Sequence, residues 1–487
     1  MKRFGFAVMA AVVALLPLYG CGGCAGEQTA AKYEIVAEYL PETQTVTGTL
    51  KLEYVNLTDE EIGELKFNLY PNAYRKDAVF KAVAPAYEKE AYYDGESYGE
   101  IVVSSVVGGT AWEVRGEDKN LLCVELERSL FYGDKVVVDI GFSTKLASVT
   151  HRSGVTKNAV NFGIFYPILC GFKDGHFFEC VYYSDGDPFY ADCAEFQMTL
   201  LLPREYVVAT GGEIVKERAL ESKKEHTVYA TNVRELSVFA SDNFVVKRIK
   251  TRGKTIEYCY FDGGMTEDLV GKRLALIKDC FAFYSNSFGE YPYQKFSFIE
   301  GEFCYSGMEY CGAALVSRGL TDGEFLRVAA HEVAHQWWYA AVGSDQTLNA
   351  WQDEGLAEFS AALFFDSKAE YGLTRAGVVD EALKNYRAFV RVYGGAFGEA
   401  DGRMTRGLSE YLSEYEYRSV SYDKGVVLFD SLYRSVGKKR FFDALKEYYR
   451  ANLFKMADIY GLIGAFEKSG VDVGGLVESF VSGKGIV

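Results

Sequence analysis

The first half of the chain alternates between apolar and polar positions. Val46, Leu50 and Leu52 would lie on one face of an extended segment, and Lys51 would lie on the other. A period of two predicts half-buried strands, and Asp-Gly pairs, which favour tight turns, recur between such segments. We therefore predict an N-terminal β domain, built on an antiparallel sheet, over residues 32–245.

The second half of the chain has the spacing of helices. After a last predicted strand near residues 255–261, apolar residues recur three and four positions apart, which is typical of a buried helix face. The first such series is Val270, Leu274, Ile277, Phe281 and Tyr284. We predict a mainly helical domain over residues 246–487, so the fold class is α+β. No linker rich in Pro, Gly or Ser separates the two domains, and we expect them to pack tightly.

The beginning of the chain has the pattern of a signal peptide. Lys2 and Arg3 precede an apolar stretch, residues 4–17, that is too short to span a bilayer as a mature helix. This length is typical of a signal-peptide core. We predict a signal peptide over residues 1–20.

The residues that follow indicate how the mature protein would be attached to a membrane. The sequence LYGC at residues 18–21 resembles a bacterial lipobox, in which Cys21 would become the lipidated first residue. Residues 21–31 would then form a tether, and the protein would be anchored to the outer face of a bacterial membrane. Ordinary secretion after cleavage near Ala25 is the alternative.

Composition and charge narrow the classes of function. Of the 487 residues, 49% are hydrophobic and eight are proline, so folded domains with substantial cores are expected. A formal net charge of −16 and the lack of a basic stripe argue against nucleic-acid binding. Ten cysteines are too few for a disulfide scaffold, and Cys304 and Cys311 are either a bridge or two buried thiols.

The strongest chemical signal is the pentapeptide HEVAH at residues 331–335. Residues four apart lie on one face of a helix, so His331 and His335 can offer two imidazole nitrogens to one metal ion, with Glu332 beside them. A helix is expected here because residues 321–324 have the pattern of a capping box, and Gly343 stands where the helix would stop.

Glu354 supplies a third candidate ligand. Eighteen residues separate it from His335, and it lies in the segment WQDEG at the start of a second predicted helix. Two histidines, one glutamate and a water form the open arrangement of a catalytic zinc rather than the closed arrangement of a structural zinc. Glu358 is either a hydrogen-bonding partner of a ligand histidine or solvated helix surface.

Four segments together resemble the gluzincin zinc aminopeptidases, the membrane alanyl aminopeptidase family. They have the family's order and spacing, and they are SGMEY (306–310), HEVAHQWW (331–338), WQDEGLAE (351–358) and YDKG (422–425). FNLYPNAY (67–74) and GDPFY (186–190) are similar to passages of the family's N-terminal domain. The resemblance therefore covers nearly the whole mature chain, and it implies that residues 246–487 form a thermolysin-like, mixed α/β catalytic domain.

The resemblance also implies roles for single residues. Glu309 matches the glutamate that binds the free α-ammonium group of the substrate, with Gly307 and Met308 beside it in the substrate site. Tyr422 matches the family's transition-state tyrosine, and Tyr417 is a further candidate for lining the site.

This chain departs from the family pattern in two ways. Ser306 and Tyr310 stand where the family usually has Gly and Asn, which alters the shape of the amine pocket but keeps its glutamate. In addition, the sequence ends where many relatives begin a large helical domain that closes one side of the cavity. A more open cleft is therefore expected.

We predict a zinc-dependent aminopeptidase that hydrolyses the N-terminal peptide bond of peptides. One zinc ion would be held by His331, His335 and Glu354, with Glu332 as general base and Tyr422 as a donor to the developing oxyanion. The alternatives are a non-catalytic, peptide-binding surface lipoprotein on the same fold and an endopeptidase. A buried glutamate that selects a free ammonium argues against the endopeptidase.

Overall fold

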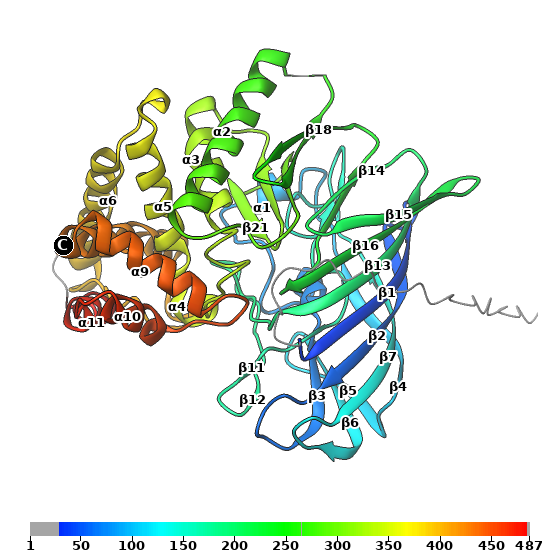
Figure 1. The fold of residues 1–487 in the computed structure, drawn as a ribbon. Helices are drawn as coiled ribbons and strands as arrows, with labels where there is room; N and C mark the ends of the chain where they lie inside the picture. Colours follow the sequence, from blue (N-terminus) through cyan, green and yellow to red (C-terminus); the bar gives the residue numbers. More distant parts are fainter. Residues whose placement is uncertain (1–28, 264, 485–487) are drawn as a thin grey trace, which may run out of the picture.

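The computed structural model describes residues 29–263 and 265–484. The predicted signal peptide, Cys21 and most of the predicted tether lie outside the described residues. Figure 1 shows the sheets of the first half gathered on one side of the molecule and the helices of the second half on the other. The fold class is α+β, as predicted.

A seven-stranded sheet forms the outer layer of the first half. Its strand order is β15-β16-β13-β1-β2-β7-β4. All neighbouring pairs are antiparallel except β1 and β13, which run parallel and are joined, as a parallel pair requires, by a long connection. The strands are β1 (Ala31–Leu40), β2 (Thr45–Val55), β4 (Glu100–Val107), β7 (Lys135–Lys145), β13 (Ala194–Pro203), β15 (Glu213–Ala219) and β16 (Lys223–Val233).

Smaller sheets complete this half. Their orders are β10-β3-β6-β5, β14-β17-β9-β8 and β11-β12. The strands are β3 (Ile62–Asn68), β5 (Ala111–Arg115), β6 (Leu121–Leu130), β8 (Gly154–Val155), β9 (Val160–Phe162), β10 (Ile168–Leu169), β11 (Phe172–Lys173), β12 (His176–Phe177), β14 (Val207–Thr210) and β17 (Val238–Ser241). The short helices η1 (Tyr70–Tyr74) and α1 (Glu88–Ala91) lie between β3 and β4.

The alternation in the sequence corresponds to the two faces of the large sheet. Val46, Leu50 and Leu52 in β2 are fully buried, whereas Thr47 and Thr49 between them are exposed. The apolar face packs against the smaller sheets to form one continuous core.

A five-stranded sheet, β18-β19-β20-β22-β21, belongs to the second half of the chain. Its strands are β18 (Phe244–Thr251), β19 (Lys254–Phe261), β20 (Lys295–Gly301), β21 (Gly307–Tyr310) and β22 (Ala313–Ser317). The prediction that β19 is the last strand was wrong. β20 and β22 are short, nearly all buried, and paired in parallel, so they lack the alternation that identifies a half-buried strand.

Helices pack on this sheet and on each other around the second main core. They are α2 (Glu267–Ser287), α3 (Asp322–Ala334), α4 (Gln346–Asn349), α5 (Glu354–Ser367), α6 (Arg375–Phe397), α7 (Glu414–Arg418), α8 (Lys424–Val436), α9 (Lys438–Ala451), α10 (Ile459–Lys468) and α11 (Gly474–Val481). The 3₁₀ turns are η2 (Ala350–Gln352), η3 (Ala369–Tyr371) and η4 (Leu408–Glu410), and η5 (Ser419–Asp423) is π-helical. Among the described residues, no helix is both long and apolar enough to cross a membrane.

Candidate active site

Helix α3 carries the HEVAH segment, and its start is as predicted. The Thr321 hydroxyl accepts from the Glu324 backbone N–H at 3.4 Å, and the Glu324 carboxylate accepts from the Thr321 N–H at 2.9 Å. This capping box satisfies two N–H groups that the helix leaves free. The predicted end near Gly343 was wrong, because the helix ends at Ala334 and His335 is its C-cap.

The chain turns back directly after His335, and this turn orients the second imidazole. The Trp338 carbonyl accepts from His335 Nδ1 at 2.9 Å, which leaves His335 Nε2 directed at His331 Nε2, 2.8 Å away. On the other ring, His331 Nδ1 lies 3.4 Å from a Glu358 carboxylate oxygen. Glu358 is thus placed as a partner of a ligand histidine, the first of its two predicted roles.

Glu354 begins helix α5 and completes the group. Its Oε2 lies 3.2 Å from His331 Nε2 and 3.3 Å from His335 Nε2, and it has no hydrogen-bond partner among the described residues. The Asp353 carboxylate accepts the Glu354 N–H at 2.9 Å and thereby caps the helix.

These three side chains fit a zinc ion. They are all buried, and their ligand atoms lie within 4.8 Å of one another. Ligand atoms of a tetrahedral zinc with bonds of about 2.0–2.1 Å lie roughly 3.3 Å apart, which agrees with both distances to Glu354. Burial opposes ionisation of Glu354, but the two histidines outweigh it and hold the pKa of Glu354 well below its usual range.

Glu332 lies in the same cavity with an unsatisfied oxygen. Its side chain is buried, and Oε2 has no hydrogen-bond partner among the described residues. Burial raises the pKa of Glu332 to about 7, although the neighbouring histidines oppose the shift. Gly307 is pressed against it, since a Cβ at Gly307 would lie 2.1 Å from Glu332 Oε1. The strand β21 therefore needs a glycine where it passes the carboxylate.

Glu309 is the third residue of β21, one position after Met308, and both are buried. Its carboxylate accepts from the Gln346 amide at 3.0 Å. Burial and the nearby Asp187 carboxylate raise the pKa of Glu309 well above its usual range. Three carboxylates, those of Asp187, Glu309 and Glu354, lie within 4.8 Å of one another at this point. Buried carboxylates at this separation need cations to remain ionised.

Three residues around Glu309 could not be assigned to the site from the sequence. Asp187 was noted only as part of a family-like passage, whereas here it reaches the site and pairs with buried Arg152. Arg152 also donates to the Met308 sulfur at 3.0 Å. Gln346, held against Glu309, keeps an unpaired buried oxygen among the described residues. The Gly-Asp-Pro sequence around Asp187 could have indicated a functional loop residue. No sequence pattern distinguishes Arg152 or Gln346.

Tyr422 lies in the π-helical turn between α7 and α8. Its ring is nearly parallel to the His331 ring, with centroids 5.9 Å apart. Burial raises the pKa of Tyr422 well above its usual range, so its phenol stays protonated and can donate. Tyr417 also lines the cleft, 5.9 Å from the Tyr422 ring, as the sequence suggested.

Helix α5, which begins with Glu354, and helix α8, which follows the turn that carries Tyr422, touch through two glycines. A Cβ at Gly355, the residue after Glu354, would lie 2.7 Å from the Gly425 Cα. A Cβ at Gly425 would lie equally close, at 2.7 Å, to the Gly355 Cα. The backbones of α5 and α8 are therefore in direct contact beside the site.

All the predicted site residues meet in or around one cleft. Its volume is about 450 Å³, and its wall includes Gly307, Met308, Glu309, His331, Glu332, Glu354 and Tyr422. His335 is fully buried and does not line the cleft, but its Nε2 lies beside the other two ligand atoms. Cys304 and Cys311, on either side of this part of the wall, are free buried thiols, the second of the two expectations for them.

The two departures from the family motif lie at the edges of β21. Tyr310 is buried and stacks edge-on against Phe239, and its hydroxyl donates to the Arg152 carbonyl at 3.4 Å. Ser306 is exposed at the cleft mouth. Neither side chain displaces Glu309 from the cleft wall.

Comparison with known proteins agrees with this geometry. Residues 273–480 match the model of the peptidase family M1 domain. This stretch, which makes up most of the second half of the chain, is similar to an M1 peptidase domain. The family resemblance seen in the sequence is thereby confirmed, and the M1 domain contains the predicted zinc ligands, Glu332, Glu309 and Tyr422.

Two curated relatives are aminopeptidases that are much longer than the part they share with this chain. Aminopeptidase M1-B of Oryza sativa subsp. japonica is 24% identical over 319 residues, which are 60% of this chain and 34% of that protein. Leucine aminopeptidase 2 of Lodderomyces elongisporus is 24% identical over 197 residues, 36% of this chain and 30% of its own length. The chain thus spans about a third of the length of these relatives.

Solved structures match the whole fold. The M1 zinc metallopeptidase of Deinococcus radiodurans superimposes with a TM-score of 0.65 at 14% identity, covering 94% of this chain and 96% of that one. A mutant of that protein bound to a Tyr-Ser-Ala substrate gives a TM-score of 0.65 at 15% identity, with 94% of each chain covered. The M1 domain and the β half together therefore have the fold of a solved M1 zinc metallopeptidase.

Proposed function

We propose that this protein is a zinc-dependent aminopeptidase that removes the first residue of peptides. The observation that carries the proposal is the position of Glu309 and Asp187, whose carboxylates lie within 4.8 Å of the metal ligand Glu354. In a peptide, the α-nitrogen and the first carbonyl carbon are only about 2.5 Å apart, from standard bond lengths. An ammonium group held by these carboxylates would therefore place the first peptide bond at the metal site.

The side chains around that bond have complementary tasks. When bound, zinc supplies Lewis acidity that polarises the carbonyl and makes water a better nucleophile. Glu332, whose free oxygen is buried beside the ligands, takes the proton from the attacking water and delivers it to the leaving amine. Tyr422, protonated because of its burial, donates to the oxyanion that develops.

The two alternative functions have less support. An endopeptidase would need to admit an uncharged internal segment past Glu309 and Asp187, which would leave two buried carboxylates without a cation. A non-catalytic peptide-binding protein would have no use for Glu332, whose free oxygen is buried beside the ligands.

We expect N-acetylated peptides to be nearly inert. Acetylation removes the charge and leaves Glu309 desolvated, so kcat/KM should fall by about 10²-fold or more relative to the free peptide. Glu309→Gln should narrow this difference, mainly by lowering activity on the free peptide, because the amide keeps the shape but loses the charge. Steady-state rates on matched free and acetylated peptides provide the measurement.

An exposed glutamate of the same domain serves as the control for this comparison. Glu370→Gln removes one exposed negative charge that does not line the cleft and should leave the discrimination between the two peptides intact. Efficient cleavage of blocked peptides at internal bonds by the unmodified protein would refute the aminopeptidase assignment in favour of an endopeptidase.

We also propose that the protein is exported and anchored to the outer face of a bacterial membrane by a lipid on Cys21. The charged start, the apolar stretch and the lipobox-like LYGC support this proposal. Cells that express the full chain with labelled palmitate should incorporate label into the protein, and Cys21→Ala should abolish it and release the protein from the membrane fraction. Unlabelled protein with a mature N-terminus near Ala25 would instead indicate secretion.

A further inference from the structure

A second cavity, of about 510 Å³, opens beside the catalytic cleft. It lies between α6 on one side and α7 with the π-helical turn on the other. The two cavities share part of their walls, namely Tyr87, Arg327, Glu358, Glu414, Arg418 and Tyr422. A peptide whose first bond lies at the metal site has this cavity available for the residues beyond that bond.

Arg418 stands at the junction of the two cavities. It precedes Tyr422 by four residues, most of them π-helical, so at a rise of no more than about 1.5 Å per residue the two backbone positions lie within roughly 6 Å along the axis. An extended peptide advances about 3.3–3.6 Å per residue. A group bound by Arg418 would therefore lie one or two residues beyond the carbonyl that Tyr422 contacts, where a dipeptide or tripeptide ends.

Four carboxylates in the wall of the second cavity each lie closer to their partners than Arg418 lies to Glu414. Glu381 accepts from Arg327 at 2.7 Å, Asp423 from the Asn385 amide at 3.2 Å, and Glu358 lies 3.4 Å from His331. Glu414 accepts from the Tyr87 hydroxyl at 2.8 Å. Within the part of the chain that the structure describes, Arg418 has one ion pair, to Glu414 at 4.0 Å, and its side chain is 64% exposed. Its guanidinium is therefore the cation most open to a new anion in this wall.

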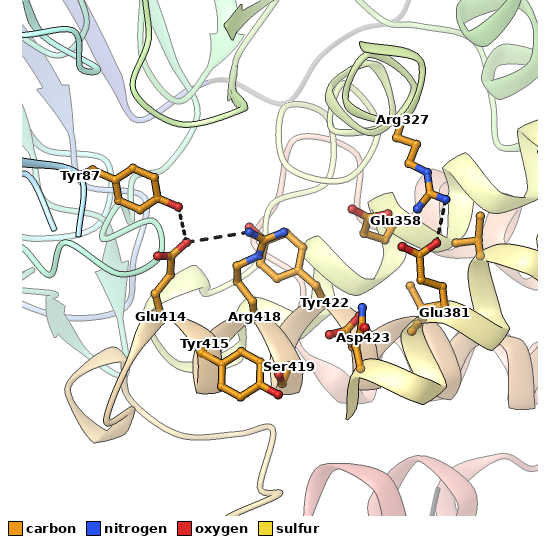
Figure 2. A pocket seen from close by; sticks show the side chains of 14 residues that line it. Tyr87, Arg327, Glu358, Glu381, Glu414, Tyr415, Arg418, Ser419, Tyr422 and Asp423 are labelled. Atoms are coloured by element: carbon orange, nitrogen blue, oxygen red, sulfur yellow. Dashed lines mark hydrogen bonds and ion pairs between the residues drawn. The ribbon is translucent and has the colours of Figure 1, made fainter. Parts of the chain in front are cut away.

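A contact between the two halves of the protein stands next to Arg418. Tyr87, which precedes α1 in the β half, packs its ring against Tyr305 with centroids 4.6 Å apart and donates to Glu414 of α7. Figure 2 shows the row formed by Tyr87, Glu414 and Arg418. The Tyr87 hydroxyl and the Arg418 guanidinium both face Glu414 Oε1, at 2.8 Å and 4.0 Å, and a long peptide passing this way would have to displace this row.

We propose that Arg418 binds the C-terminal carboxylate of the substrate, so that di- and tripeptides with a free carboxyl group are the preferred substrates. The planar guanidinium suits a carboxylate, which it can bind through two parallel hydrogen bonds. The inference rests on the proposed aminopeptidase function and adds the substrate class, because it fixes both ends of the peptide.

The test compares Ala-Ala-Ala with its C-terminal amide, two substrates that share the same first residue. The zinc-loaded protein should cleave the acid with a kcat/KM at least tenfold above that of the amide. Arg418→Met should lower kcat/KM at least tenfold more for the acid than for the amide, through KM. Arg418→Lys, which keeps the charge without the planar fork, should retain part of the preference.

The matched control is Arg391→Met, which removes an exposed arginine of α6 outside both cavities and should keep the preference intact. Equal cleavage of acid and amide by the unmodified protein would overturn the substrate class while leaving the aminopeptidase function standing. A preference that survives in Arg418→Met with an unchanged KM for the acid would overturn the role of Arg418. Failure to cleave either peptide or any aminoacyl amide would contradict the proposed function itself.

Discussion

A protein in which both His331 and His335 are replaced by Ala is expected to bind no zinc and to lose all measurable peptidase activity. The two imidazoles supply two of the three ligand atoms, and Glu354 alone cannot hold the ion at ordinary free zinc concentrations. Elemental analysis of the purified protein should give about one zinc per chain for the unmodified protein and none for the double variant.

The control for this variant is His176→Ala, which removes an exposed histidine on the strand β12. It should keep both the zinc and the activity. Stoichiometric zinc in the double variant would show that the ion is bound elsewhere, and the ligand assignment would then be abandoned.

Glu332→Gln is expected to keep its zinc and lose its turnover. Glu332 is not among the three ligand atoms, and glutamine has the same shape in the space beside Gly307. Because a positioned general base contributes about 10²- to 10⁴-fold to such reactions, kcat should fall by that factor with little change in zinc content. Zinc analysis and steady-state kinetics on one preparation would check both parts.

Two results would contradict the assigned role of Glu332. A kcat close to that of the unmodified protein would remove Glu332 from the proton transfer. Loss of zinc together with activity would mean that the carboxylate helps to hold the ion, so that the variant no longer separates the two roles.

The metal group could be predicted from sequence because its pattern is local. His331, Glu332 and His335 lie within one helical turn and one cap, and Glu354 begins the next long helix. Strand alternation in β2 was equally visible, since one face of that strand is buried and the other is exposed.

The other parts of the site and fold could not be predicted because they depend on contacts between segments that are distant in the sequence. Arg152 and Asp187 come from loops of the β half and reach Glu309 only because the two halves pack against each other. The strands β20 and β22 have no alternating pattern because they are buried on both faces. The end of α3 was misplaced for a related reason: the turn after His335 is fixed by backbone contacts such as that of Ala340 with His335, not by a local stop signal.

The contact between Gly355 and Gly425 has a consequence for how this site can change. Since the two backbones already touch, the closest approach of α5 to α8 is set by main-chain atoms rather than by side-chain packing. We expect any larger residue at either glycine to push α5 and α8 apart, and with α5 the ligand Glu354, whereas substitutions on the outer faces of the two helices should leave the helix spacing unaltered. Substitutions around the rim of the cleft can therefore alter specificity without changing the spacing of α5 and α8.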